Sequence, residues 1–163
     1  MGEKIILALD ASTTAVGWCC GQGETYLNSG TYQPQGDCAE ARILAISTRI
    51  MDMIATYDPD LVAIEKPMGH HGNLHTDRLL ARVGGIIEGV CRTLDPPVDV
   101  IYVHPIHVKQ TPFHKHATLA AANYAGKESV SGDEADAIGI WQVALGRLQA
   151  AEFRNLTARE ETQ

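Results

Sequence analysis

Short apolar runs along the chain predict the strands of a sheet. Three runs have the character of buried strands and are too short for ordinary helices. They lie at residues 4–10, 61–65 and 98–105. After the first run, "ASTTAVGWCCGQG" and "ETYLNSGTYQ" favour two more strands, joined by a turn at residues 21–23. The first three strands therefore predict an antiparallel meander.

Apolar residues at helical spacing predict the helices that separate and follow these strands. Residues 37–57 show this spacing, and Asp37 is the expected N-cap of the helix. A second helix is expected from about residue 74 to 94. The segment 106–129 favours a turn and a helix, and a last helix is expected from about 131 to 151.

The order of these elements predicts the fold class. A meander followed by strands that alternate with helices indicates an α/β fold, with a mixed five-stranded sheet flanked by helices. The chain has 163 residues, which suits one domain with a sizeable core. We expect that domain to span residues 1–151 and the polar segment 152–163 to form a frayed tail.

Composition excludes several classes of protein. No apolar run reaches the roughly 18 residues of a membrane span, and Asp10 interrupts the first apolar run, so neither a membrane segment nor a signal peptide is expected. The four cysteines form no C-x-x-C pair, which favours free thiols in a reducing cytoplasm. The formal net charge of −7 argues against an extended basic surface, although a local basic face remains compatible with it.

Two of the predicted strands end on an acid. Asp10 closes "ILALD" and Glu65 closes "LVAIE". If the two strands are neighbours in the sheet, both side chains emerge at the edge where α/β proteins usually bind ligands. In the last helix, "SGDEADAIGIW" places Asp133 and Asp136 three residues apart and therefore on one face.

Convergence of these four acids would predict a metal site. Buried carboxylates repel one another, and divalent cations relieve that repulsion. Oxygen ligands without cysteine or histidine suit Mg²⁺ or Mn²⁺ better than Zn²⁺. The structural alternative is that acids in a first helical turn merely favour the helix dipole. An acid that ends a buried strand, as Asp10 and Glu65 do, is less common but not diagnostic. Each feature alone therefore favours a structural role, whereas the combination favours metal binding.

The chain resembles the RuvC family of Holliday junction resolvases, which belong to the RNase H-like superfamily. The resemblance rests on the strand-terminal Asp10 followed by small residues and "VGW", on "VAIE", on the late "DxxDA" helix and on "VKQT" at 108–111, and it covers roughly residues 4–150. It implies an RNase H-like fold and a cytoplasmic enzyme of a bacterial cell or a phage-infected host. It also implies a metal-dependent endonuclease that cuts four-way DNA junctions by paired symmetric nicks.

The same resemblance assigns roles to individual residues. It implies that Asp10, Glu65, Asp133 and Asp136 are the catalytic acids and hold two Mg²⁺ ions, with Mn²⁺ able to substitute. It further implies that Lys109 meets a DNA phosphate. Its other implied partners are branched DNA and a second copy of the chain, because a two-fold dimer would match a two-fold junction. The glycine-rich "VGGIIEGV" of the second helix is compatible with such a helix–helix contact or with packing inside one chain.

Three features depart from the bacterial members and suggest a divergent, phage-type protein. The family's second lysine has only Lys115 as a counterpart, and Met68 stands near the place of an aromatic wedge residue. The acidic net charge is the third departure. Lys66 and Arg82, together with Lys109 and Lys115, could supply a local positive face for DNA.

Other interpretations remain open from the sequence. "LALDASTTAVGW" also resembles the first phosphate motif of actin-like and sugar-kinase proteins, but these need two such domains. A noncatalytic binder of branched DNA would use the same fold with a decayed site. The histidines of "GHHGNLH" and "HPIHVKQTPFHKH" lack the spacing of strong zinc motifs, so exposed loop histidines are expected instead.

Overall fold

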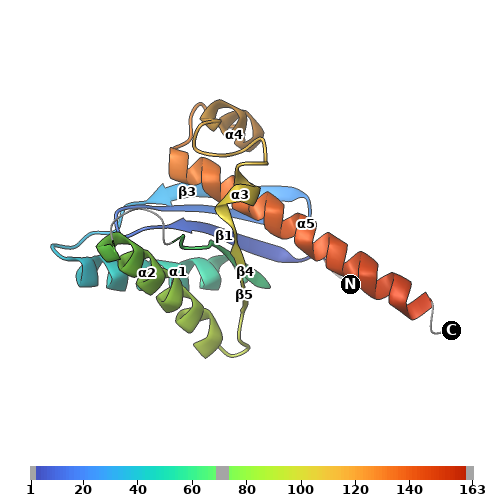
Figure 1. Cartoon of the computed structure of the whole chain (residues 1–163), viewed down its shortest axis with the longest axis horizontal. Coiled ribbons are helices and arrows are strands. Elements are labelled where there is room, and N and C mark those ends of the chain that lie inside the picture. Colours follow the sequence, from blue (N-terminus) through green and yellow to red (C-terminus); the bar gives the residue numbers. More distant parts are fainter. Residues whose placement is uncertain (1–2, 69–73, 161–163) are drawn as a thin grey trace.

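A five-stranded mixed sheet forms the centre of the molecule in the computed structural model, which describes residues 3–68 and 74–160 (Figure 1). The strand order across the sheet is β3-β2-β1-β4-β5. The strands are β1 (Ile5–Ala11), β2 (Val16–Gln22), β3 (Thr25–Tyr32), β4 (Leu61–Glu65) and β5 (Asp99–Val103). β1, β2 and β3 pair antiparallel, whereas β4 is parallel to both β1 and β5. The predicted fold class is confirmed.

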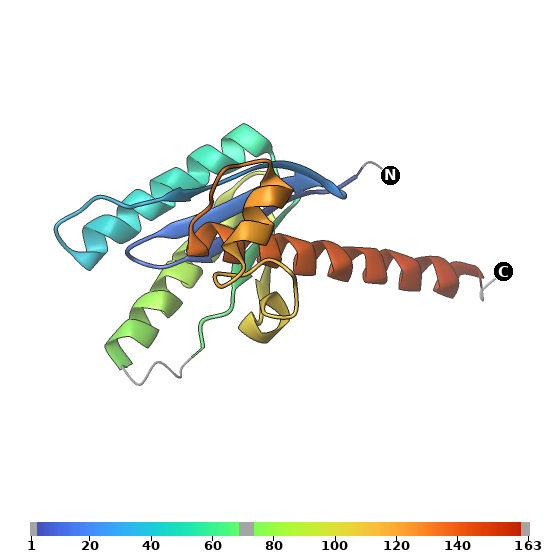
Figure 2. The same ribbon diagram turned by 90° about the horizontal axis from the view of Figure 1, so that it is seen from above.

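Helices cover both faces of this sheet. They are α1 (Ala39–Tyr57), α2 (Leu74–Thr93), α3 (Pro105–Val108), α4 (Thr118–Ala125) and α5 (Gly132–Glu160). Helices α1 and α2 lie on one face, and α5 crosses the other face and extends beyond the sheet (Figures 1 and 2). None of the described helices is long and apolar enough to cross a membrane.

Strand alternation divides the core into two layers. In β1, Ile6 and Ala8 belong to the cluster under α5, whereas Leu7 and Leu9 belong to the cluster under α1 and α2. The alternation follows from the two-residue repeat of a strand, and all four side chains are fully buried. The position of a residue along β1 or β4 therefore decides which face of the sheet its side chain is on.

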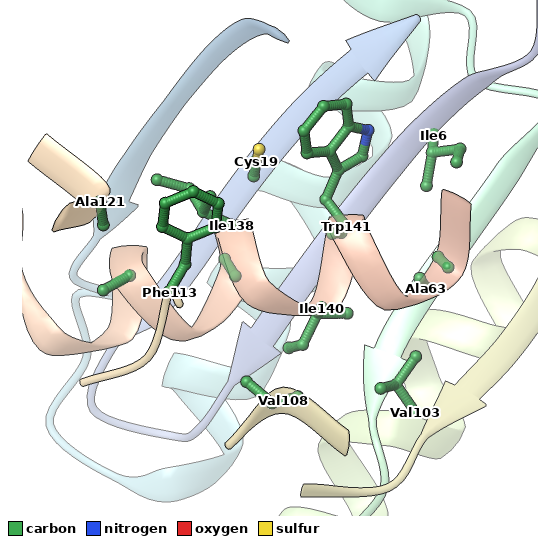
Figure 3. Close-up of a cluster of buried hydrophobic side chains, with 14 of the residues drawn as sticks. Ile6, Cys19, Ala63, Val103, Val108, Phe113, Ala121, Ile138, Ile140 and Trp141 are labelled. Carbon is green, nitrogen blue, oxygen red and sulfur yellow. The ribbon is translucent and has the colours of Figure 1, made fainter. Parts of the chain in front are cut away.

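Helix α5 packs on the sheet through its apolar side. Figure 3 shows Ile138 and Trp141 projecting from α5 toward the strand that carries Cys19. Trp141 is 1% exposed, and a Cβ on Gly21 of β2 would lie 2.4 Å from its ring. Glycine at position 21 therefore makes room for the indole, and this contact fixes where α5 crosses β2.

Two helix ends differ from the expectation. The N-cap of α1 is Cys38 with no side-chain cap, so the prediction that Asp37 caps this helix was wrong. Helix α5 continues to Glu160 rather than ending near Ala151, because neither Gly nor Pro interrupts the chain between these residues. Most of the segment predicted as a frayed tail is thus helical in the structure.

Candidate metal and nucleic-acid site

The alternation of β1 and β4 directs Asp10 and Glu65 to the same face of the sheet. Asp10 has the same parity as Ala8, and Glu65 has the same parity as Ala63, which also lies under α5. The strands are parallel neighbours, and Leu9 pairs with Ile64, so the two acids follow at adjacent positions. Both carboxylates therefore emerge on the α5 side, at the carboxyl ends of their strands.

The first turn of α5 lies against β2 beside Asp10. Gly17 pairs with Asp10 across the β1–β2 ladder. A Cβ on Gly17 would lie 2.0 Å from the carbonyl oxygen of Asp133, which is closer than any side chain allows. The absence of a side chain at Gly17 therefore lets the helix start next to the strand-terminal acid, and this brings Asp133 to the site.

The segment between α3 and α4 holds Asp136 from another side. The backbone N–H of Lys115 donates to Asp136 Oδ1 at 2.8 Å. Within the same segment the Thr111 hydroxyl hydrogen-bonds Phe113, and a Cβ on Gly139 of α5 would lie 2.3 Å from the Phe113 carbonyl oxygen. This close contact fixes the segment against α5 and keeps Lys115 near the acids.

The four predicted acids line one cavity of about 510 Å³. Four of the five predicted DNA-contacting residues line it as well: Lys66, Met68, Lys109 and Lys115. Three histidines share the same wall: His104, His114 and His116. The fifth predicted residue, Arg82, does not line the cavity and instead pairs with Glu40 at 3.2 Å. The guanidinium of Arg82 is thus directed to α1, and its contact with DNA stays a prediction.

Burial, and then the charges of neighbouring carboxylates, raise the pKa values of three of these acids. The pKa of Asp10 is well above its ordinary value, first because of burial and then because of the charges of Glu65, Asp136 and Asp133. Burial and the charge of Asp136 also raise the pKa of Glu65, against the opposing effects of Lys115 and a hydrogen bond with Asp10. Burial likewise raises the pKa of Asp136. These carboxylates share a space in which like charges repel.

The donor set fits a hard divalent cation. All four groups are carboxylates, and no ion pair between described residues neutralises any of them. In the same part of the chain no three His, Cys, Asp or Glu side chains stand close enough to hold one ion. The acids thus line a common cavity without forming a closed cage around one ion. Donors that are all oxygen suit Mg²⁺ or Mn²⁺.

Sequence reasoning missed one polar group beside the site. Glu134 is buried and contacts Ser29 and Lys127, neither of which the sequence singled out. The only sequence signal was the "SGDE" pattern that opens α5, which is typical of a helix cap. Of the other histidines, His70 and His71 lie outside the described residues.

Comparison with known proteins identifies the fold. No protein-family model and no curated protein sequence matches the chain. Among solved structures, Thermus thermophilus RuvC in complex with a Holliday junction substrate is similar with a TM-score of 0.68 and 17% identity, over 84% of this chain and 89% of that one. The yeast mitochondrial Holliday junction resolvase Ydc2 is similar with a TM-score of 0.57 and 10% identity, over 87% and 80% of the two chains.

A viral protein extends this similarity. The fowlpox virus Holliday junction resolvase matches with a TM-score of 0.56 and 12% identity, over 88% of this chain and 99% of that one. At such identities the similarity concerns the fold. The meander, the parallel strands β4 and β5 and the crossing helix α5 are therefore those of the RuvC-like RNase H fold, and the chain adopts that fold.

Proposed function

We propose that the protein is a metal-dependent endonuclease that cuts branched DNA, with the four-way junction as its main substrate. One observation carries this proposal: Asp10, Glu65, Asp133 and Asp136 reach one cavity from two strands and one helix. The burial and mutual repulsion of these acids would be costly without bound cations. Similarity in fold to three Holliday junction resolvases supports the choice of substrate.

The four acids would hold two Mg²⁺ ions, and Mn²⁺ should substitute. Such ions, when bound, would activate a water molecule for attack and offset the negative charge on the departing 3′ oxygen. The chain contributes the rigid placement of the ligands. Asp10 and Glu65 are fixed by the register of β1 and β4, and Asp136 accepts the hydrogen bond from the Lys115 backbone. The products would be 5′ phosphate and 3′ hydroxyl ends.

Lysines around the cavity would position the DNA backbone. Lys66, Lys109 and Lys115 line the cavity together with the acids, so a phosphate that reaches the acids also meets positive charge. Such contacts orient a duplex without reading bases. Met68 lines the same cavity and offers an apolar side chain to an unpaired base at the crossover. The net charge of −7 is thus compatible with a locally basic rim.

A homodimer would present two such sites to a two-fold symmetric junction. Gly85 and Gly89 of α2 are exposed, and a Cβ on either glycine would meet nothing within 4 Å. Packing inside one chain, which was one of the two alternatives for the glycine-rich stretch, therefore does not account for these two glycines. The surface they leave open is available to a second copy.

Cleavage of synthetic DNA tests the proposal. Four-way junctions should be nicked in two symmetric strands with Mg²⁺, and intact duplex, flap and three-way DNA should be cut more slowly. In the presence of a chelator, the protein should still bind the junction without cutting it, and its affinity for the junction should fall steeply as the salt concentration rises. Binding without cutting under every metal condition would identify a noncatalytic junction binder and contradict the nuclease proposal.

Replacement of Lys115 by Met should shift the pH dependence of cleavage. The Lys115 ammonium lowers the pKa values of Asp10, Glu65 and Asp136. Its loss raises those pKa values, so more alkaline solution is needed to ionise the metal ligands. The acidic limb of the single-turnover rate profile should therefore move to higher pH. Lys4→Met, at the other end of β1, should leave that limb in place, and an unshifted limb in Lys115→Met would exclude this electrostatic role.

A further inference from the structure

A buried acid opens α5 on a side of the helix that the proposed chemistry does not use. Glu134 is 6% exposed, and it is the one charged residue in the described part of the chain whose surface is this fully covered. It lies in the chain between Asp133 and Asp136. Because successive residues of a helix are turned by about 100°, Glu134 faces away from the direction shared by these two acids. Its carboxylate therefore reaches other parts of the fold.

Two elements supply partners for this carboxylate. The Ser29 hydroxyl of β3 donates to Glu134 Oε1 at 2.6 Å, and Lys127 Nζ donates to the same oxygen at 2.6 Å. Lys127 follows α4 and also donates to the backbone carbonyl oxygen of Ser29 at 2.6 Å. The three residues form one closed network, which we call the Ser29–Lys127–Glu134 network. It ties the first turn of α5 to β3 and to the segment after α4.

The local sequence alone would have placed Glu134 differently. In the pattern "SGDE", the serine hydroxyl accepts from the fourth residue, and the glutamate side chain usually turns back to cap the helix. The first half of this pattern is present, because Glu134 N–H donates to Ser131 Oγ at 3.0 Å. The carboxylate, however, is held by Ser29 and Lys127. Ser131 itself contacts the Thr31 hydroxyl of β3 at 2.5 Å, so both residues attach the helix start to the same strand.

Stability alone does not account for an ion pair in which Glu134 is buried and the Lys127 side chain is 32% exposed. Desolvation of a buried charge commonly cancels much of the attraction within such a pair, and apolar residues of similar size often serve as well. What the pair does provide is a defined orientation of the Glu134 carboxylate. Lys127 Nζ also donates to the carbonyl oxygen and the hydroxyl oxygen of Ser29, and these bonds hold the ammonium group in place beside the carboxylate. A fixed Glu134 fixes the rotation of the first turn of α5, and this rotation sets where the Asp133 and Asp136 carboxylates lie.

We propose that the Ser29–Lys127–Glu134 network positions the Asp133–Asp136 face of α5 for metal binding. This inference rests on the proposed metal-dependent function, which it deepens by naming residues that do not line the cavity of the four acids. Partners that orient metal ligands typically contribute 10- to 100-fold to metal affinity. Loss of the network should therefore weaken metal binding by about tenfold or more while the fold persists.

Titration calorimetry with Mn²⁺, without DNA, tests this inference. The variants are Glu134→Gln, Lys127→Met and the milder Ser29→Ala, with Lys4→Met as the control. Lys4 pairs with Asp60 at 2.8 Å at the other end of β1, so its replacement removes the same charge from a pair remote from the acids. We expect Lys127→Met and Glu134→Gln to lower the affinity for Mn²⁺ by about tenfold or more. Lys4→Met should leave that affinity unchanged. Thermal melting in chelator shows that each variant is folded.

The outcomes separate this inference from the function on which it rests. If the wild-type protein fails to bind Mn²⁺, or if the Asp10→Asn variant binds Mn²⁺ with the same affinity as the wild-type protein, the metal site and the network proposal are both overturned. If the wild-type protein binds Mn²⁺ through Asp10 but the network variants bind it equally well, only the positioning role is overturned. A variant that does not fold is replaced by Ser29→Ala, whose unchanged affinity would likewise overturn that role. Partial recovery of affinity by Lys127→Arg would support positioning by a charge-assisted bond.

Discussion

Asp10→Asn is expected to abolish cleavage while junction binding in chelator persists. Asp10 adjoins Glu65 in the sheet and shares its cavity with Asp133 and Asp136, so its replacement removes a charged ligand from the centre of the acid cluster. Metal-assisted stabilisation of a phosphoryl transition state amounts to several kcal/mol, and loss of about 4 kcal/mol slows the reaction by about 10³-fold. Single-turnover cleavage of a junction measures this loss.

The same substitution should stabilise the metal-free fold. The folded state raises the pKa of Asp10 above its ordinary value of 3.8 through burial and neighbouring acids. The folded protein therefore binds this proton more tightly than the unfolded chain does, and its stability falls as pH rises from the unfolded toward the folded pKa. Asparagine has no charge to bury. Thermal melting in chelator at neutral pH should thus give a higher midpoint for Asp10→Asn, with the difference shrinking below about pH 4.

A matched control separates the site from general charge effects. Asp52→Asn makes the same change on the exposed side of α1 and should alter neither cleavage nor the melting midpoint. Added Mg²⁺ should raise the midpoint of the wild-type protein more than that of Asp10→Asn, because ligands that bind the folded state stabilise it. Retained cleavage by Asp10→Asn would remove Asp10 from the catalytic set.

Gly17→Ala should disable the protein by displacing α5. The added Cβ would lie 2.0 Å from the carbonyl oxygen and 2.2 Å from the carbonyl carbon of Asp133, and a backbone atom cannot move aside as a side chain does. Overpacking of this kind typically costs about 1–3 kcal/mol of stability. A shift of about 1 Å in a positioned group can slow a reaction by about 10²-fold. Denaturant unfolding and single-turnover cleavage should both show the loss.

Gly146→Ala serves as the control for that substitution. Gly146 lies in α5 and is exposed, and an added Cβ there would meet nothing within 4 Å. Alanine at this position should therefore stabilise the helix by up to about 1 kcal/mol. Its cleavage rate should match the wild-type rate. Equal stability and activity in Gly17→Ala and the wild-type protein would show that α5 does not depend on close approach to β2.

The start of α1 and the position of Arg82 in α2 show what the sequence patterns could not predict. Asp37 satisfied the composition rule for an N-cap, yet α1 begins after Cys38 without a side-chain cap. Its buried face, which includes Ile43, Ile46 and Ile50, anchors the helix on the sheet instead. Arg82 was predicted to belong to a basic face for DNA, and the structure pairs its side chain with Glu40 of α1. Both the start of α1 and this pair depend on how the helices pack, which no local pattern shows.

The sequence by itself determined the sheet, the order of its strands along the chain and the acids at the ends of β1 and β4. These features follow from short-range patterns, because strand alternation and strand ends are properties of neighbouring residues. Only the tertiary structure decided that α5 starts against Gly17 and that Glu134 turns to Ser29 and Lys127. Ser29 and Glu134 are 105 positions apart in the chain, and the geometry of such a contact depends on how whole elements pack.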